Sequence, residues 1–275
     1  MGIELANDAV ARPTALDHAI ARLEVMIVDE LEPGMQMKSE GELAIECDVS
    51  RLTIREALKV LAGRGLVELS RGKRPLIKEP DSAVLSGYLA VAIRRDPGAL
   101  LELVQIRRSL EVLSVTLAAR NARRASVAAI DTAYQAMAAA AAGLPGEEEE
   151  TAYHEADVAF HEALALASGN RMLTFILEGL EESLRHSFHR SFAGRLARGE
   201  SAEAALEAHR QIFERVQNGD ARGAATAMRE HLKDAERDLR AALRGPEGPL
   251  SDSRTRSKKP DLARPRPYET KGLAL

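Results

Sequence analysis

The stretch from Ser50 to Leu66, SRLTIREALKVLAGRGL, constrains the fold of this 275-residue chain more than any other. Its apolar residues at positions 54, 57, 58 and 61 have the spacing of a helix with one face buried against a core. Arg51 and Arg55 are four residues apart, so they lie together on another face of that helix, one turn from each other. Ser50 is a favoured N-terminal cap. The stretch therefore predicts a docked helix that presents two arginines to solvent.

The residues before this helix predict two further helices. Apolar residues recur at intervals of three or four over 14–31, and the Pro-Gly pair at 33–34 ends that helix. Ser39 and Glu42 have the spacing of a capping box, in which each side chain bonds the other residue's backbone N–H. They start a short second helix, and residues 47–49 form the turn that leads into the arginine-bearing helix. A helix, a three-residue turn and a second helix make a helix-turn-helix.

The residues after this helix predict a β-hairpin. Short apolar segments at 66–69 and 75–78 flank a basic turn at 71–74, which is the pattern of a wing. We therefore assign 13–79 to a winged helix-turn-helix domain that binds DNA. Residues 1–12 show no pattern and are expected to be disordered.

The charge of this region supports a DNA-binding role. Residues 50–78 hold eight Lys or Arg and two Glu, although the whole chain has a formal net charge of −4. A local basic patch on an acidic protein suits a surface that meets phosphate on one side only. Arginine pairs bidentately with guanine or phosphate, and helix N-termini and hydroxyls bind phosphate. The expected DNA contacts are Ser39, Ser50, Arg51, Thr53, Arg55, Gly72, Lys73 and Arg74.

These motifs resemble the winged-helix domain of the GntR family of bacterial transcription regulators over residues 16–78. The run S-R-x-x-I-R-E-A-L, at 50–58, is the most specific part of the match. Thr53 stands where many members have proline, and the wing reads Gly-Lys-Arg-Pro instead of a Gly-Arg-Gly turn. The resemblance implies that Arg51, Arg55 and Gly72 contact DNA.

The chain from residue 82 onward predicts an all-α bundle. Helical segments at 82–94, 98–120, 126–142, 148–168, 170–194, 201–217 and 221–243 are separated by short Gly-, Pro- and Asn-containing breaks. The fold class is therefore mostly α: an N-terminal winged helix-turn-helix followed by a bundle of about seven helices over 82–243. Residues 246–275 are rich in Pro, Ser and Arg and are expected to form a disordered tail.

Four residues of the bundle have the chemistry of a metal site. Asp157 and His161 are four apart on one helix face, and His209 and His231 lie on the two following long helices. Three imidazoles and a carboxylate from three helices are able to surround one divalent ion. Histidines in helices are more often hydrogen-bonded or solvated, and this alternative stays open on spacing alone.

Residues 100–239 resemble the FCD effector-binding domain of the FadR subfamily, through Asp157-x-x-Phe160-His161, Ser168-Gly169-Asn170, His209 and His231. The resemblance implies that the Asp and three His bind zinc, nickel or manganese. An ion with open positions attracts a carboxylate, and a nearby arginine would hold a second oxyanion. Arg107 is the first candidate for that arginine and Arg185 the second. The alternative for Arg107 is an i,i+4 salt bridge with Glu111.

The cysteine content and the hydropathy of the chain narrow the cellular compartment that we expect. Cys47 is the only cysteine, so an internal disulfide and a cysteine metal cluster are excluded. No apolar run approaches the ~18 residues of a membrane span, and the N-terminus has no signal-peptide pattern. We expect a cytoplasmic protein without membrane contact.

Together these features predict a ligand-controlled transcription regulator. One small reading head covers a half-site, so a homodimer on a palindromic operator is expected. A small carboxylic or sugar acid at the metal would control DNA affinity, and repression is the expected mode by resemblance. A helical metalloenzyme with an accessory DNA-binding head is the main alternative, although no H-E-x-x-H motif is present. A constitutive architectural DNA protein would leave the second domain unexplained.

Overall fold

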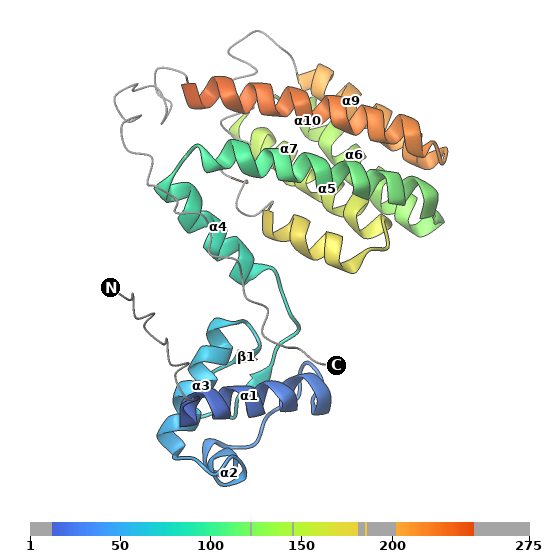
Figure 1. The fold of residues 1–275 in the computed structure, drawn as a ribbon. Coiled ribbons are helices and arrows are strands. Elements are labelled where there is room, and N and C mark those ends of the chain that lie inside the picture. The colour runs from blue at the N-terminus through green and yellow to red at the C-terminus, as the bar shows by residue number, and fades with distance from the viewer. Residues whose placement is uncertain (1–12, 122, 145, 181–184, 186–201, 245–275) are drawn as a thin grey trace, which may run out of the picture. The chain divides into compact units, whose positions relative to one another are not determined.

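The computed structural model describes residues 13–121, 123–144, 146–180, 185 and 202–244. The chain divides into two compact units, and the division follows Tyr88. Each unit has its own hydrophobic core. The mostly α-helical class and the winged helix-turn-helix are confirmed (Figure 1). The predicted disordered segments, 1–12 and 246–275, lie outside the described residues, as does part of the predicted helix at 170–194.

The first unit is a helix-turn-helix with a short hairpin. Its elements in chain order are α1 (Ala15–Val25), η1 (Met26–Glu30), α2 (Glu40–Glu46), α3 (Arg51–Gly63), β1 (Val67–Glu68) and β2 (Leu76–Ile77). η1 is a short π-helical continuation of α1. α2 begins with the predicted capping box: the Glu42 backbone N–H donates to Ser39 Oγ, and the Ser39 N–H donates to the Glu42 carboxylate at 2.7 Å. This capping box fixes where α2 starts, and the cap at Ser50 fixes where α3 starts.

The core of this unit lies between α1, α2 and α3. Ile54 and Leu61 of α3 are fully buried with Leu23 of α1 and Leu43 of α2. This is the predicted apolar stripe, and its burial orients the opposite face of α3 outward.

The hairpin is shorter than the sequence predicts. β1 and β2 pair antiparallel over two residues each, with Val67 opposite Ile77, where four-residue strands were expected. An isolated bridge between Gln36 and Leu76 adds a third segment to the hairpin. The wing is therefore held by the segment before α2 as well as by the pairing of β1 with β2.

The second unit is a helical bundle. Its elements are α4 (Ala83–Arg95), α5 (Ala99–Asn121), α6 (Arg124–Ala141), α7 (Glu147–Ala167), a helical segment at 171–180, α9 (Ala202–Gln217) and α10 (Ala221–Arg244). α6 packs along α7, and α10 packs along α5 and α9 (Figure 1). The division between the units falls inside α4, whereas the sequence suggested a boundary at 79–81. The side chain of Val84 lies against Gly65, which accounts for the first half of α4 grouping with the first unit.

Candidate DNA-reading face and metal centre

The N-terminus of α3 is ordered by its own hydroxyl groups. The Thr53 backbone N–H donates to Ser50 Oγ at 3.0 Å, and the two side-chain oxygens lie 2.8 Å apart. This cap satisfies one of the free amides of the first turn, and other amides there remain available to a phosphate.

The first turn of α2 holds both arginines of α3. Arg55 makes a forked contact with Glu40: its Nε lies 3.1 Å from each carboxylate oxygen, and Nη2 lies 2.6 Å from Oε2. The hydrogen bond from Arg55 lowers the pKa of Glu40. Arg51 lies against Gly41, where a Cβ atom would sit 3.0 Å from the arginine Nη2. Glu40 therefore orients Arg55, and the absence of a side chain at Gly41 leaves room for Arg51.

A groove of about 560 Å³ separates the start of α2 and α3 from the wing. Its lining includes five of the predicted contact residues, namely Ser39, Arg55, Gly72, Lys73 and Arg74. Gly72 has φ of +73°, a left-handed conformation that glycine adopts without strain, and it allows the tight basic turn. Arg74 lies 3.3 Å from Glu42. Glu40, which the sequence analysis did not single out, lines the same groove.

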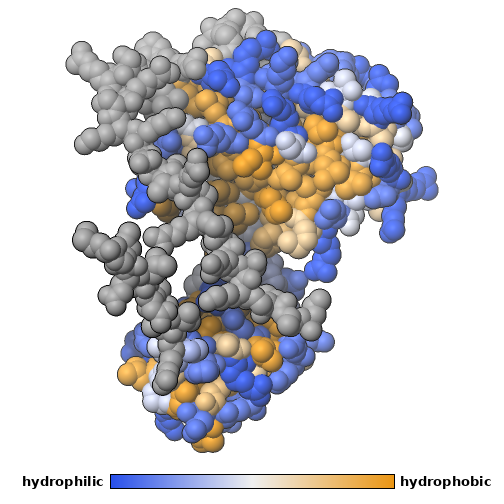
Figure 2. Space-filling view, in the orientation of Figure 1, coloured by the Kyte–Doolittle hydropathy of each residue, from blue (hydrophilic) through white to orange (hydrophobic). Residues whose placement is uncertain are grey.

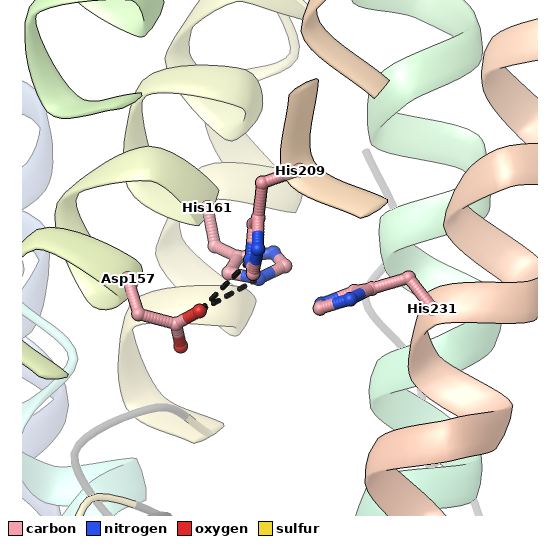
Figure 3. Close-up of side chains that lie close together, drawn as sticks. All are labelled: Asp157, His161, His209 and His231. Carbon is pink, nitrogen blue, oxygen red and sulfur yellow. Dashed lines mark ion pairs between the residues drawn. The ribbon is translucent and has the colours of Figure 1, made fainter. Parts of the chain in front are cut away.

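In the second unit, the four predicted metal ligands converge. Asp157 and His161 project from α7, His209 from α9 and His231 from α10 (Figure 3). Each offers one ligand atom, and these atoms all lie within 4.8 Å of one another. His161 and His209 are almost completely buried. The structure thus brings together, from three helices, the residues that the sequence places far apart.

Two neighbours fix the orientation of these imidazoles. His209 Nδ1 donates to the Ala205 carbonyl at 2.8 Å. His161 Nδ1 contacts the carboxylate of Glu111 on α5. Both Nδ1 atoms therefore carry hydrogen, and the rings turn their Nε2 atoms into the cluster.

This arrangement fits a bound cation. Both Nε2 atoms are buried without a hydrogen-bond partner, and His209 Nε2 lies 2.9 Å from an Asp157 oxygen. A cation bound between this nitrogen and this oxygen would satisfy both atoms. The donor set of three imidazoles and one carboxylate suits a divalent transition ion.

The electrostatics favour the metal-binding forms of Asp157 and His231. Burial acts to raise the pKa of Asp157, but the three imidazoles, His209 foremost, hold it well below its usual range. Burial and the neighbouring His209 and His161 hold the pKa of His231 well below its ordinary value. An ionised carboxylate and neutral imidazole are the forms that bind metal.

The predicted effector arginines occupy different settings. Arg107 is 3% exposed and forms a buried ion pair with Glu111. This is the alternative considered from the sequence, and it extends the chain of contacts from His161 through Glu111 to Arg107. Arg185 is half-buried, and its charge acts on Glu162 of α7. Sequence reasoning recognised Glu111 only as a partner of Arg107, because no spacing rule links α5 to α7.

Comparisons with known proteins agree with both units. Residues 16–77 match the bacterial regulatory proteins of the gntR family, and residues 102–234 match the FCD domain. The HTH-type transcriptional regulator LutR of Bacillus subtilis is 32% identical over 208 residues, covering 75% of this chain and 92% of LutR. The chain belongs to the GntR family of bacterial transcription regulators.

Other relatives of this GntR-family regulator are also transcription regulators. The Glc operon transcriptional activator of Escherichia coli K12 is 28% identical over 79% of this chain and 85% of its own. The repressor NanR of Edwardsiella tarda is 28% identical over 81% of this chain and 90% of its own. A solved structure titled Streptococcus agalactiae GntR shares the fold, with a TM-score of 0.64, 24% identity, and coverage of 82% of this chain and 99% of that one. Among the described residues, no helix is long and apolar enough to cross a membrane.

Proposed function

We propose that this regulator binds a palindromic operator as a homodimer and that a small carboxylic or sugar acid, bound at a divalent metal in the helical bundle, controls its affinity for DNA. The observation that carries the proposal is the buried cluster of Asp157, His161, His209 and His231, in the same chain as an arginine-bearing recognition helix. The GntR and FCD matches give the coarser statement, a transcription regulator with an effector domain.

The DNA contacts are proposed for the outward face of α3 and the wing. Arg51 and Arg55 would reach base edges or phosphates from the first turns of α3. Ser39, Ser50 and Thr53 would bond phosphates. The groove-lining wing residues, Gly72, Lys73 and Arg74, would contact the neighbouring backbone. The exposure of this face and its charge support the assignment.

The homodimer is proposed to form through the bundle. A broad hydrophobic area covers α5 and the segment 171–180 (Figure 2). Ile106 and Leu113 of α5 and Met172 are large apolar side chains with about half or more of their surface exposed. Contiguous patches of this kind mark protein interfaces. A second copy of the chain would cover this face and place two reading heads on one operator.

The effector is proposed to bind at the metal through an oxygen ligand. Asp157, His161, His209 and His231 would hold zinc, nickel or manganese, and a coordination position left open would take a carboxylate or hydroxyl oxygen. Arg107 is proposed to hold a second oxyanion, and its chain of contacts through Glu111 to His161 supports this role. Arg185 is proposed as the weaker candidate. An acid that binds one arrangement of the protein better than another shifts DNA affinity by that difference.

Repression relieved by the acid is the proposed direction of control. NanR is named a repressor and the Glc protein an activator, so the relatives support regulation in both directions. Transcription of a reporter downstream of the operator, with and without the regulator, decides the direction.

The experiment that tests the function measures operator affinity. An operator is first selected from random duplex DNA with the full-length, zinc-loaded protein. Fluorescence anisotropy then follows binding in the presence of carboxylic and sugar acids, before and after chelation. We expect one acid to change the affinity by about 5- to 150-fold, the usual range of allosteric coupling, and chelation to remove the response. An affinity that no acid changes would contradict the proposal.

A metalloenzyme with an accessory DNA-binding head remains the second candidate. A hydrolytic metal site needs a general base near the metal-bound water. Glu111, an acid that contacts the proposed ligand His161, also pairs with Arg107 and is not free to serve as one. We infer that the protein is not an enzyme. Turnover of candidate acids by the metal-loaded protein would contradict this.

A further inference from the structure

We propose that Leu52 reads the 5-methyl group of a thymine in the operator, one or two base pairs from a base contacted by Arg55. The inference rests on the proposed use of α3 as the recognition helix. It adds a specificity-determining residue that contributes no charge and no hydrogen bond.

Leu52 differs from the other large aliphatic residues of α3. Its side chain is 65% exposed, whereas Ile54, Leu58 and Leu61 are at most 1% exposed. A leucine at this position gains nothing from the core of the first unit. The exposed leucine is the second residue of α3, at the end of the helix that a helix-turn-helix presents to base edges.

The helical spacing places Leu52 on the same ridge as charged residues. Arg55, Glu56 and Lys59 follow it at intervals of three, four and seven, so all four share the face opposite the buried stripe. Leu52 and Arg55 are separated by about 4.5 Å along the axis, from the rise of 1.5 Å per residue. Base pairs stack about 3.4 Å apart. The two side chains therefore reach neighbouring or next-neighbouring base pairs.

The chemistry of the major groove leaves one partner for a leucine. Leucine has no donor or acceptor, so it gains nothing from a phosphate or from the polar edges of guanine, adenine and cytosine. The 5-methyl group of thymine is the one apolar group on the major-groove edges of the four standard bases. Burying it against the leucine removes apolar surface of both partners from water.

The neighbouring residues favour DNA over a protein as the occupant. Arg51 and Arg55 flank Leu52 along the helix, and contacts with Gly41 and Glu40 hold both guanidinium groups in place. Thr53 is tied to Ser50. Isolated exposed apolar residues are common on protein surfaces and by themselves indicate nothing. Here the leucine lies within a basic surface whose charge complements a phosphate backbone.

The test replaces individual thymines with deoxyuridine, which removes only the methyl group. The full-length protein and the operator selected with it are used. At one position per half-site we expect affinity to fall about three- to fivefold, the size of effect for one buried methyl group. In Leu52→Ala the same replacement should change affinity less than 1.5-fold. The matched control is Val28→Ala, at an aliphatic residue of η1 that is 73% exposed, and it should keep the wild-type sensitivity.

A second readout separates this inference from the proposed function. Operator selection repeated with Leu52→Ala should lose the thymine preference at that position and keep the guanine preferences. Because Leu52 is exposed, the variant should retain the wild-type thermal stability. If Leu52→Ala keeps the sensitivity to deoxyuridine, or if no thymine is sensitive in the wild type, the inference is wrong. If Arg55→Ala also leaves selection unchanged, the recognition-helix assignment itself fails.

Discussion

The reading face of the first unit and the metal centre of the second are built on opposite principles. The reading face collects its residues from one stretch, 39–74, and leaves them half-exposed in ion pairs such as Arg55 with Glu40. The metal centre gathers Asp157, His161, His209 and His231 from three helices and buries the imidazoles of His161 and His209. The first site is open to a partner as large as DNA, whereas the second is enclosed by the helices that form it.

The difference in burial predicts a difference in how each site responds to its ligand. Exposed ion pairs are weak because water screens them, so a phosphate or base edge competes for Arg55 at little cost. Buried polar atoms without partners are costly, so the cluster should be stabilised by whatever cation fills it. We therefore expect DNA to change the reading face locally and metal to change the stability of the second unit as a whole.

The largest expected effect comes from removing one metal ligand. His209→Ala removes an imidazole whose Nε2 faces the cluster, and metal affinity should fall by more than about a hundredfold, beyond the usual loss when a residue that only supports a ligand is changed. Competition with a chromogenic chelator measures this. His18→Ala, an exposed histidine of α1, is the control and should keep full metal content. A His209→Ala protein with wild-type affinity would exclude this residue as a ligand.

The next effect concerns the reading face. Arg55→Ala should weaken specific operator binding by about 2–6 kcal/mol, or roughly thirtyfold or more, if each protomer of the dimer loses one bidentate contact. Metal content should not change, because α3 and the cluster belong to different compact units, each with its own core. Arg64→Ala is a matched control: Arg64 is an exposed arginine at the opposite end of α3 that pairs with Glu24. An unchanged footprint for Arg55→Ala would contradict the assignment.

A smaller effect tests whether Glu111 helps to position the proposed metal ligand His161. Glu111→Gln keeps the size of the side chain but removes the charge that orients His161, so metal affinity should fall about 10- to 100-fold. Ser114→Ala is the control on the same helix: its buried hydroxyl has no hydrogen-bond partner among the described residues, and its loss should leave metal binding unchanged. Equal affinities for the two variants would show that Glu111 does not position the ligand.

The smallest effect should show whether Glu40 orients Arg55 for DNA binding or only repels DNA. Glu40→Gln frees Arg55 and removes one negative charge facing DNA. If Glu40 orients Arg55, specific affinity falls severalfold while non-specific affinity rises slightly, so the specificity ratio drops. The measurement is anisotropy with operator and with random DNA at matched salt. A rise of both affinities by the same factor would show that Glu40 only repels DNA.

Local patterns predicted the first unit well because its function and its fold use the same short segments. The capping box at Ser39 and the buried stripe through Ile54 were both readable from spacing, and both are present. The strands were predicted too long, since hydrophobicity marks which residues are apolar and not how far pairing extends. Glu40 was missed, because an ion pair across two helices leaves no trace in spacing.

In the second unit, periodicity was less informative. Helix α5 carries apolar residues on most of its circumference, with Leu103 buried and Leu113 half-exposed. Its pattern therefore does not tell which face meets the bundle. The choice between a salt bridge and a ligand role for Arg107 was left open for the same reason, and the structure adds the ion pair with Glu111.

The sequence by itself determined the helices, their caps, the outward arginines of α3 and the residue types of a metal site. These depend on interactions within a few residues, where the chain's own geometry sets the distances. Only the tertiary structure decided that the proposed metal ligands meet, namely Asp157, His161, His209 and His231. It also decided that Glu111 orients the ring of His161 and that the Ala205 carbonyl orients the ring of His209. Convergence of separate helices depends on how their buried faces pack, and packing is a property of the whole core, which no local pattern contains.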